Sequence, residues 1–438
     1  MKTLLSGIFL ISCTAIHAQP TIAGITQAEK KTVIDSLCSL LDGYYIFPEK
    51  CVAARQLIQD NFKKKKYEPV SDPRIFADRL TDDIRSVISD RHFRLYFNPE
   101  QVAAERNAAV ASDSSTLILH EYEAGKEHNF GFDQVKILDG NIGYMNITGF
   151  HPLKYSAESV NVAMAFLQNV KALIIDLRNN RGGASDMGPY LSSFFFPAEN
   201  SLLLYDLYTR DGKTTIHEQA RTAACVQGSR QPGMDLYLLT SSFSFSASEA
   251  LAYTLQSLGR ATIVGQQTAG GAHMWTGKVV TDRFYAHIPY ARPVDPRTGT
   301  NWEGAGVTPN IKCASKDALA MAHIQALERL QQKDTAGSAI YQWHLAAVRA
   351  ALNIIDIPAD KLRSYAGRYG DKVIEFSNGT LYLKWNGTDN KLTPLAAGYF
   401  SVEGFNYFRL KFLHENNRVT ALQIINDNGS AREYPVSQ

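Results

Sequence analysis

The stretch 235–265 constrains the fold of this 438-residue chain more than any other. An apolar run over 236–240 predicts a short strand, and a serine-dense loop over 241–246 follows it. From Ala247 onward, apolar residues recur at helical spacing until Gly259, and a second apolar run begins shortly afterwards. Strand, helix and strand in this order predict a parallel α/β unit, in which the loop after the first strand leads into a helix N-terminus.

Ser246 ends the serine-dense loop and is a candidate nucleophile. The N-terminus of the predicted helix offers free backbone N–H groups and positive potential, and the Ala247 N–H comes directly after the serine. A serine in this position is also an ordinary helix N-cap, so local chemistry alone leaves both roles open. No Gly-x-Ser-x-Gly motif occurs in the chain, which argues against an α/β-hydrolase.

Three ordered blocks of sequence resemble the S41 serine peptidases. The first is Ser-Ala-Ser-Glu at 246–249 with the glycine-rich stretch 259–271, the second is the apolar strand and Asp-Leu-Arg-Asn-Asn-Arg-Gly-Gly of 172–183, and the third is 301–309. This family includes the tail-specific (C-terminal processing) proteases, the tricorn core and the repeats of interphotoreceptor retinoid-binding protein. The resemblance covers about residues 30–330 and implies a ClpP/crotonase-like α/β core with a mainly parallel sheet.

The resemblance also implies which residue activates the serine. In tail-specific proteases the base is a lysine 25 residues after the nucleophile, but that position is Gly271 here, and Lys278 is out of register. The tricorn branch uses a histidine from the end of the helical region and a glutamate after the core strands, which correspond to His92 and Glu303. Tricorn has a serine before that histidine, whereas this chain has Arg91, which leaves that supporting contact open.

Each candidate also has a purely structural interpretation. His92 is one of eleven histidines, Glu303 could simply bind a loop, and Asp176 with Arg178 is better explained as a structural ion pair than as catalytic groups. If His92 is the base, we expect it within hydrogen-bond reach of the serine, and activity to fall as its imidazole protonates near pH 6.5. The catalytic set implied by the family is Ser246, His92 and Glu303, with the backbone of Ala247, Gly182 and Gly183 as the oxyanion hole.

The first 18 residues have the pattern of a signal peptide. Lys2 is followed by an apolar run over 4–13, and a small residue, Ala18, stands before the expected cleavage point. The apolar run is too short to span a bilayer. We expect export to the periplasm or the medium. The alternative is a lipoprotein with a lipidated Cys13, and only in that case do we expect a membrane partner.

Composition restricts the classes of partner. A formal net charge of +2 without a basic stripe argues against nucleic-acid binding. The four cysteines after the signal segment lack metal-ligand spacing, so we expect neither a metal nor another cofactor. Cys38 and Cys51 are the nearest pair, and the sequence leaves open whether they form a disulfide bond.

The chain divides into three predicted domains after the signal segment. Residues 19–97 are predicted to be helical up to a final short strand, and residues 98–355 to form the α/β core, beginning with a strand at 116–119. The core offers no room for the PDZ domain that tail-specific proteases insert. From 358 to 438 the pattern changes to short alternating strands, which predicts a separate all-β domain.

The sequence supports two functions of different classes. The first is an exported serine-type peptidase that cleaves a peptide or an unfolded protein through an acyl-enzyme. The alternative is a non-catalytic module of the same fold that binds an apolar ligand or a peptide. The joint presence of Ser246, His92 and Glu303 favours the enzyme.

Overall fold

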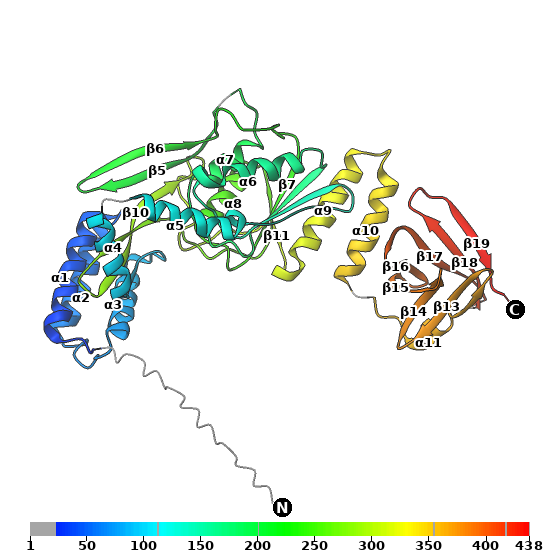
Figure 1. The fold of residues 1–438 in the computed structure, drawn as a ribbon, viewed down its shortest axis with the longest axis horizontal. Helices are drawn as coiled ribbons and strands as arrows, with labels where there is room; N and C mark the ends of the chain where they lie inside the picture. The colour runs from blue at the N-terminus through cyan, green and yellow to red at the C-terminus, as the bar shows by residue number, and fades with distance from the viewer. Residues whose placement is uncertain (1–22, 112–113, 200, 354, 417, 438) are drawn as a thin grey trace, which may run out of the picture.

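The computed structural model of the chain describes residues 23–111, 114–199, 201–353, 355–416 and 418–437. The predicted signal peptide and Cys13 lie outside these residues. Among the described residues, no helix is both long and apolar enough to cross a membrane. In Figure 1 a helical region at one end, an α/β core, a pair of helices and an all-β region follow one another along the chain.

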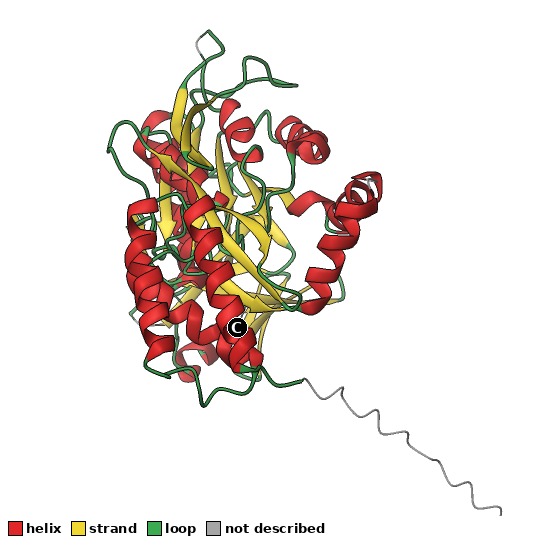
Figure 2. Cartoon of the chain, turned by 90° about the vertical axis from the view of Figure 1, so that its left-hand side faces the viewer, coloured by secondary structure: helices red, strands yellow, loops and turns green. Residues whose placement is uncertain are grey.

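Three amphipathic helices build the N-terminal region, as predicted. They are α1 (Gln27–Tyr44), α2 (Pro48–Lys63) and α3 (Pro73–Ile88), and strand β1 (Arg94–Phe97) follows them. Thr26 caps α1 by accepting a hydrogen bond from the Glu29 N–H at 3.2 Å, and Asp72 caps α3 through the Arg74 N–H at 2.8 Å. Figure 2 views the molecule from this end, with these helices nearest the viewer. Cys38 and Cys51 are both buried in this region as free thiols.

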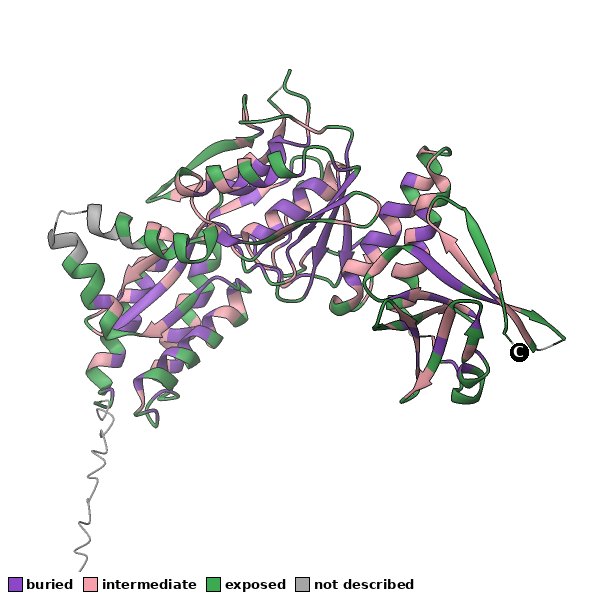
Figure 3. Cartoon of the chain, turned by 45° about the vertical axis from the view of Figure 1, so that its right-hand side comes forward, coloured by how far each residue is buried: buried purple, intermediate pink, exposed green. Residues whose placement is uncertain are grey.

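The central sheet carries the site and is parallel apart from one edge strand. Its order is β11-β8-β7-β4-β3-β2, and only β2 runs antiparallel to its neighbour. The strands are β2 (Phe132–Leu138), β3 (Ile142–Ile147), β4 (Ala172–Asp176), β7 (Asp235–Thr240), β8 (Thr262–Gly265) and β11 (Ile311–Lys312). Every residue of β4 and of β7 is buried, which explains why these strands are continuous apolar runs in the sequence (Figure 3).

Helices cover both faces of this sheet. One face packs against α6 (Leu153–Phe166), α7 (Met187–Ser193) and α8 (Ala247–Ser257). The other face packs against α9 (Ala318–Lys333) and α10 (Ser338–Leu352). This arrangement confirms the α/β core with a mainly parallel sheet.

A second, antiparallel sheet was not predicted. Its order is β1-β10-β5-β6, with β9 also paired to β10. The strands after β1 are β5 (Leu203–Asp211), β6 (Thr214–Arg221), β9 (Met274–Val279) and β10 (Phe284–Val294). The long strand β10 joins the N-terminal helices to the core, because Phe284, Ala286 and Ile288 pack among those helices. Asp211-Gly212, with Gly212 at φ +59°, was an available hairpin signal.

The strand predicted at 116–119 is wrong. These residues lie in α5 (Ser114–Glu127), which follows α4 (Pro99–Ala111). A run of four residues cannot by itself distinguish a strand from a helix. The strong helix formers that follow it, Glu121, Glu123, Ala124 and Lys126, extend a helix through it.

The C-terminal residues form an eight-stranded antiparallel meander that closes on itself. A bridge between Tyr369 and Val436 and a hydrogen bond from the Ser437 N–H to the Arg368 oxygen at 2.8 Å join the last strand to the first. The all-β prediction is confirmed. The elements are α11 (Ala359–Arg363), β12 (Gly367–Tyr369), β13 (Lys372–Ser377), β14 (Thr380–Trp385), β15 (Thr388–Ala396), β16 (Tyr399–Val402), β17 (Phe405–Glu415), β18 (Arg418–Asn426) and β19 (Ala431–Pro435).

A polar and aromatic contact attaches this closed meander, called the near-barrel below, to α10. The Arg409 guanidinium lies 3.8 Å from the ring centroid of Trp343 and donates to the Trp343 backbone oxygen at 2.5 Å. The Trp343 indole N–H in turn donates to the Asn406 oxygen at 2.9 Å. The apolar interior of the near-barrel is a cluster of its own, so the two regions have separate cores.

Candidate active site

Ser246 occupies the junction between β7 and α8 in a conformation that a non-glycine residue rarely adopts. Its φ is +59° and its ψ is −123°. Such a backbone costs about 1–3 kcal/mol and persists only where the surrounding structure holds it. A helix N-cap needs no such geometry, because N-cap residues usually have extended backbones. Ser246 is the N-cap of α8, but capping alone does not require this conformation.

Glu249 holds this conformation, and sequence reasoning missed its role. Its buried carboxylate accepts from the Ser246 N–H at 2.8 Å, and from the N–H groups of Gly270 at 2.7 Å and Gly271 at 2.9 Å. The Thr268 hydroxyl also donates to it, at 2.5 Å. Burial raises the pKa of Glu249, and these hydrogen bonds oppose that rise. The spacing Ser-x-x-Glu at the start of a helix was the available signal, because it is that of a capping box.

The backbone of Gly182 lies too close to Ser246 to leave room for a side chain. A Cβ atom on Gly182 would lie 2.7 Å from the Ser246 Cβ and 2.8 Å from the Ala247 nitrogen, and φ of Gly182 is +92°. Gly183 has φ +132°, and a Cβ there would lie 2.0 Å from the Phe150 oxygen. Any larger residue would displace this loop from the serine.

The backbone N–H groups of this loop are not equally available. The Gly182 N–H donates to the side-chain oxygen of buried Asn180 at 2.7 Å, so it is already engaged. For the N–H groups of Gly183 and Ala247, no acceptor is found within the described part of the chain. Both residues line the same cavity as Ser246. Of the three predicted oxyanion donors, two are therefore free to bind a ligand.

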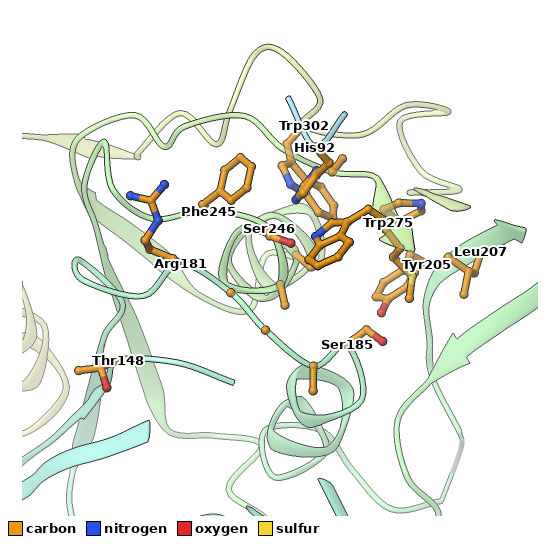
Figure 4. Close-up of a pocket in the computed structure, with 18 residues that line it drawn as sticks. His92, Thr148, Arg181, Ser185, Tyr205, Leu207, Phe245, Ser246, Trp275 and Trp302 are labelled. Carbon is orange, nitrogen blue, oxygen red and sulfur yellow. The ribbon is translucent and has the colours of Figure 1, made fainter. Parts of the chain in front are cut away.

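His92 reaches the same cavity from the loop between α3 and β1 (Figure 4). Its ring lies 4.5 Å from that of Phe245, centroid to centroid. Both ring nitrogens are buried and have no hydrogen-bond partner among the described residues, so the predicted hydrogen bond to Ser246 is not formed. Burial is the largest cause that lowers the pKa of His92, to about 4, which corrects the expectation of an ordinary value. The imidazole is neutral at neutral pH.

Glu303 forms no hydrogen bond with the His92 ring. Its Oε1 accepts from the Arg91 N–H at 3.2 Å, and its Oε2 accepts from the Ala272 N–H at 2.5 Å. The carboxylate thus joins the backbone beside His92 to the backbone that follows Gly271. Burial and the neighbouring Asp90 carboxylate raise the pKa of Glu303.

Asp90 and His273 form a second buried link to the His92 loop. The Nδ1 of His273 lies 2.6 Å from Asp90 Oδ2, and Asp90 Oδ1 accepts from the His92 N–H at 3.0 Å. Asp90, His273 and Glu303 have ligand atoms within 4.8 Å of one another and carry donor types that could hold a metal ion. The two carboxylates accept hydrogen bonds from the His92, Arg91 and Ala272 N–H groups, so the cluster links the His92 loop to the backbone after Gly271.

The place where a lysine base would stand is sterically closed. A Cβ on Gly271 would lie 2.1 Å from a ring carbon of Phe245 and 2.8 Å from the Cε1 of His92. Lys278 instead lies with its Nζ 4.0 Å from the ring centroid of Tyr44. Two basic side chains, His92 and Arg181, line the cavity of Ser246, and of these only the imidazole can accept a proton.

The cavity has a volume of about 570 Å³ and is largely apolar. The Trp302 indole N–H donates to the Gly271 oxygen at 2.9 Å, which fixes one wall. Such a cavity suits an apolar side chain of a ligand. Large apolar side chains around it come from distant parts of the chain, namely Tyr205, Leu207, Phe245, Met274, Trp275 and Trp302.

Comparisons with known proteins agree with this architecture. Residues 141–313 match the model of peptidase family S41, and residues 21–126 match the N-terminal domain of peptidase S41 in eukaryotic IRBP. The tail-specific protease of Haemophilus influenzae is 31% identical over 224 residues, which are 48% of this chain and 29% of that protein. Carboxyl-terminal-processing peptidase 3, chloroplastic, of Arabidopsis thaliana is 27% identical over 175 residues, which are 40% of this chain and 32% of that protein.

Solved structures are similar over a larger share of the chain. The photosystem II D1 C-terminal processing protease is 16% identical with a TM-score of 0.41, covering 67% of this chain and 94% of that one. The tricorn protease is 13% identical with a TM-score of 0.39, covering 67% of this chain and 35% of that one. The chain spans about a third of the two curated relatives named above. By the two family models, the chain belongs to peptidase family S41.

Proposed function

We propose that this protein is a serine-type peptidase with Ser246 as its nucleophile. The observation that carries the proposal is the strained Ser246 in one cavity with a buried histidine, whose two ring nitrogens have no hydrogen-bond partner among the described residues. A neutral imidazole without a partner can accept a proton, which is what a serine hydroxyl needs in order to attack a carbonyl.

The reaction follows the usual course of acyl transfer. Ser246 Oγ attacks the scissile carbonyl carbon while His92 takes the hydroxyl proton, and the oxyanion is bound by the N–H groups of Ala247 and Gly183. His92 then gives the proton to the leaving amine as the C–N bond breaks. Water, deprotonated by His92, hydrolyses the acyl-enzyme and restores the serine. Substrate binding brings His92 and Ser246 into hydrogen-bond distance, because such contacts tighten in the complex.

The remaining polar residues act on position and not on the reacting atoms. Glu303 holds the loop of His92 through the Arg91 N–H, and Glu249 holds the Ser246 N–H. The substrate is a peptide or an unfolded protein whose apolar side chain enters the aromatic cavity. The pattern of residues 1–18 supports export of the enzyme.

The alternative, a binding module without catalysis, is not favoured. A module that only binds an apolar ligand requires neither a strained serine backbone nor two free N–H groups beside its hydroxyl. Such features cost folding free energy and are typical of sites where strain is part of the mechanism.

Site-directed substitution tests the proposal. Ser246→Ala should abolish cleavage of an unfolded protein such as reduced casein, while circular dichroism and the unfolding midpoint stay close to wild type. Ser242→Ala, at an exposed position in the same loop, is the matched control and should retain full activity. Cleavage by the Ser246→Ala variant at the wild-type rate would overturn the assignment.

A further inference from the structure

A second cavity adjoins the apolar one and has the opposite chemistry. Its volume is about 450 Å³, and three arginines, Arg85, Arg91 and Arg181, line it. The two cavities share Arg181 and Phe245 in their walls. Figure 4 shows the ring of Phe245 between the Arg181 guanidinium and His92. A peptide that crosses Ser246 could therefore extend from one cavity into the other.

The three arginines of this second cavity are not paired with carboxylates of the described residues. Within the described residues, none of the three guanidinium groups forms an ion pair. Arg85 donates to the backbone oxygens of Phe93 at 2.9 Å and Arg91 at 2.7 Å. Arg91 and Arg181 are exposed, and their side chains have no hydrogen-bond partner in the part of the chain that the structure describes. Asp90 is the one carboxylate in the lining, and it already faces His273 and the His92 N–H.

The position of the arginine cavity indicates which part of the substrate, before or after the scissile bond, it would bind. The loop residues just before His92 form its wall. In acyl transfer the histidine protonates the leaving amine, so the fragment that leaves lies on the side of the histidine. His92 also lines the apolar cavity, so the side follows from the two cavities together. With the residue before the cleaved bond in the apolar cavity, the arginine cavity beyond Phe245 faces the part of the substrate that follows that bond.

We propose that this cavity is a subsite for a carboxylate on the leaving side of the peptide substrate. Guanidinium groups bind carboxylates through paired, charge-assisted hydrogen bonds, and two unpaired arginines at one cavity match that chemistry. The carboxylate is either the free C-terminus of a short leaving fragment or the side chain of an acidic residue. This inference rests on the proposed peptidase function.

Paired peptides distinguish the two sources. The probe is dansyl-Ala-Ala-Phe-Ala-Ala, made as the C-terminal acid and as the amide, together with the amides of dansyl-Ala-Ala-Phe-Ala-Glu and dansyl-Ala-Ala-Phe-Ala-Gln. Titrated into the Ser246→Ala chain, a carboxylated peptide should bind roughly tenfold more tightly than its neutral partner, as one charge-assisted contact predicts. Preference for the acid over the amide identifies a C-terminal subsite, and preference for Glu over Gln identifies a side-chain subsite.

Arginine variants show whether the preference for a carboxylated peptide comes from this cavity. Combining Arg91→Gln with Arg181→Gln should remove the preference, whereas Arg418→Gln, which removes the same charge from an exposed position on the near-barrel, should keep it. Arg85 is left unchanged because it supports the loop of His92 through two carbonyls. A preference that survives in the double variant, or equal binding of charged and neutral peptides, overturns the inference.

Cleavage by the wild-type chain separates this inference from the proposed function. If kcat/KM is the same for the charged and the neutral member of each pair, the subsite is wrong and the peptidase stands. If none of the peptides nor casein is cleaved while carboxylate-selective binding is seen, the peptidase is wrong and the subsite stands.

Discussion

Acidification should destabilise this protein through His92. The residue is 6% exposed, and its burial lowers the pKa of the ring from 6.5 to about 4 in the folded chain. The unfolded chain therefore binds a proton at a higher pH than the folded chain does. The stabilisation is complete above about pH 6.5 and is lost progressively as the pH falls toward about 4.

The pKa difference sets the size of the effect. Between pH 8 and pH 5 the unfolded state gains a proton on this ring and the folded state does not, which lowers the free energy of unfolding by about 2 kcal/mol. The full difference of about 2.5 pKa units corresponds to about 3 kcal/mol, reached below about pH 4. Other histidines add to the pH dependence of the whole protein, so the contribution of His92 must be isolated by substitution.

His92→Gln isolates it, because glutamine is polar but does not titrate in this range. The difference in the free energy of unfolding between the two proteins at pH 8, measured with urea, gives the cost of the substitution itself. The same difference at pH 5 also contains the contribution of proton binding to His92. Unfolding is followed by the fluorescence of Trp275 and Trp302, which line the cavity. Trp343 and Trp385 are replaced by Phe in both proteins, so that the signal comes from the core alone. The variant should lose about 2 kcal/mol less than the parent between the two pH values. An equal loss in both proteins would show that His92 is not buried as a neutral ring.

Three further predictions concern Glu249, Gly182 and the near-barrel. Glu249→Gln should lower the free energy of unfolding by about 3 kcal/mol, measured by urea titration. The reason is that the NH2 group of the glutamine would face buried N–H donors that in the parent protein bind a carboxylate oxygen. A loss below about 0.5 kcal/mol would refute this role. Gly182→Ala should reduce kcat at least tenfold by displacing the glycine pair, whereas Gly233→Ala, where a Cβ meets nothing within 4 Å, should not change it; normal turnover by the first variant would contradict the close approach. Deletion of 358–438 should leave a soluble, active core by size-exclusion chromatography, since the near-barrel has its own apolar cluster; aggregation would mean that it covers an apolar face exposed at Trp343.

Elements set by local sequence were predictable. The strand and helix around Ser246 follow from a continuous apolar run, a serine loop and helical spacing, all within 235–265. The three N-terminal helices were predictable for the same reason. The hairpin β5–β6 was missed because its strands are only partly buried and lack a strong apolar pattern. The helix α5 was misassigned because a short apolar run fits both helix and strand.

The environment of the candidate site could not be predicted from local pattern. Whether His92 is paired or unpaired depends on Phe245 and on Gly271, each more than 150 residues away in sequence. Burial is the largest cause of the lowered pKa of its ring, and the nearby Asp90 carboxylate opposes it. The arginine cavity likewise exists only because the loop of Arg91 and the loop of Arg181 meet in the folded chain.

Covalent labelling tests the central claim, that Ser246 is an activated nucleophile. The full chain is treated with a fluorophosphonate at neutral pH, digested and analysed by mass spectrometry. We expect one adduct on the peptide that contains Ser246, its absence in Ser246→Ala, and a rate of labelling that falls strongly in His92→Gln. A folded protein that takes up no label, or an adduct that persists in Ser246→Ala, would contradict the account.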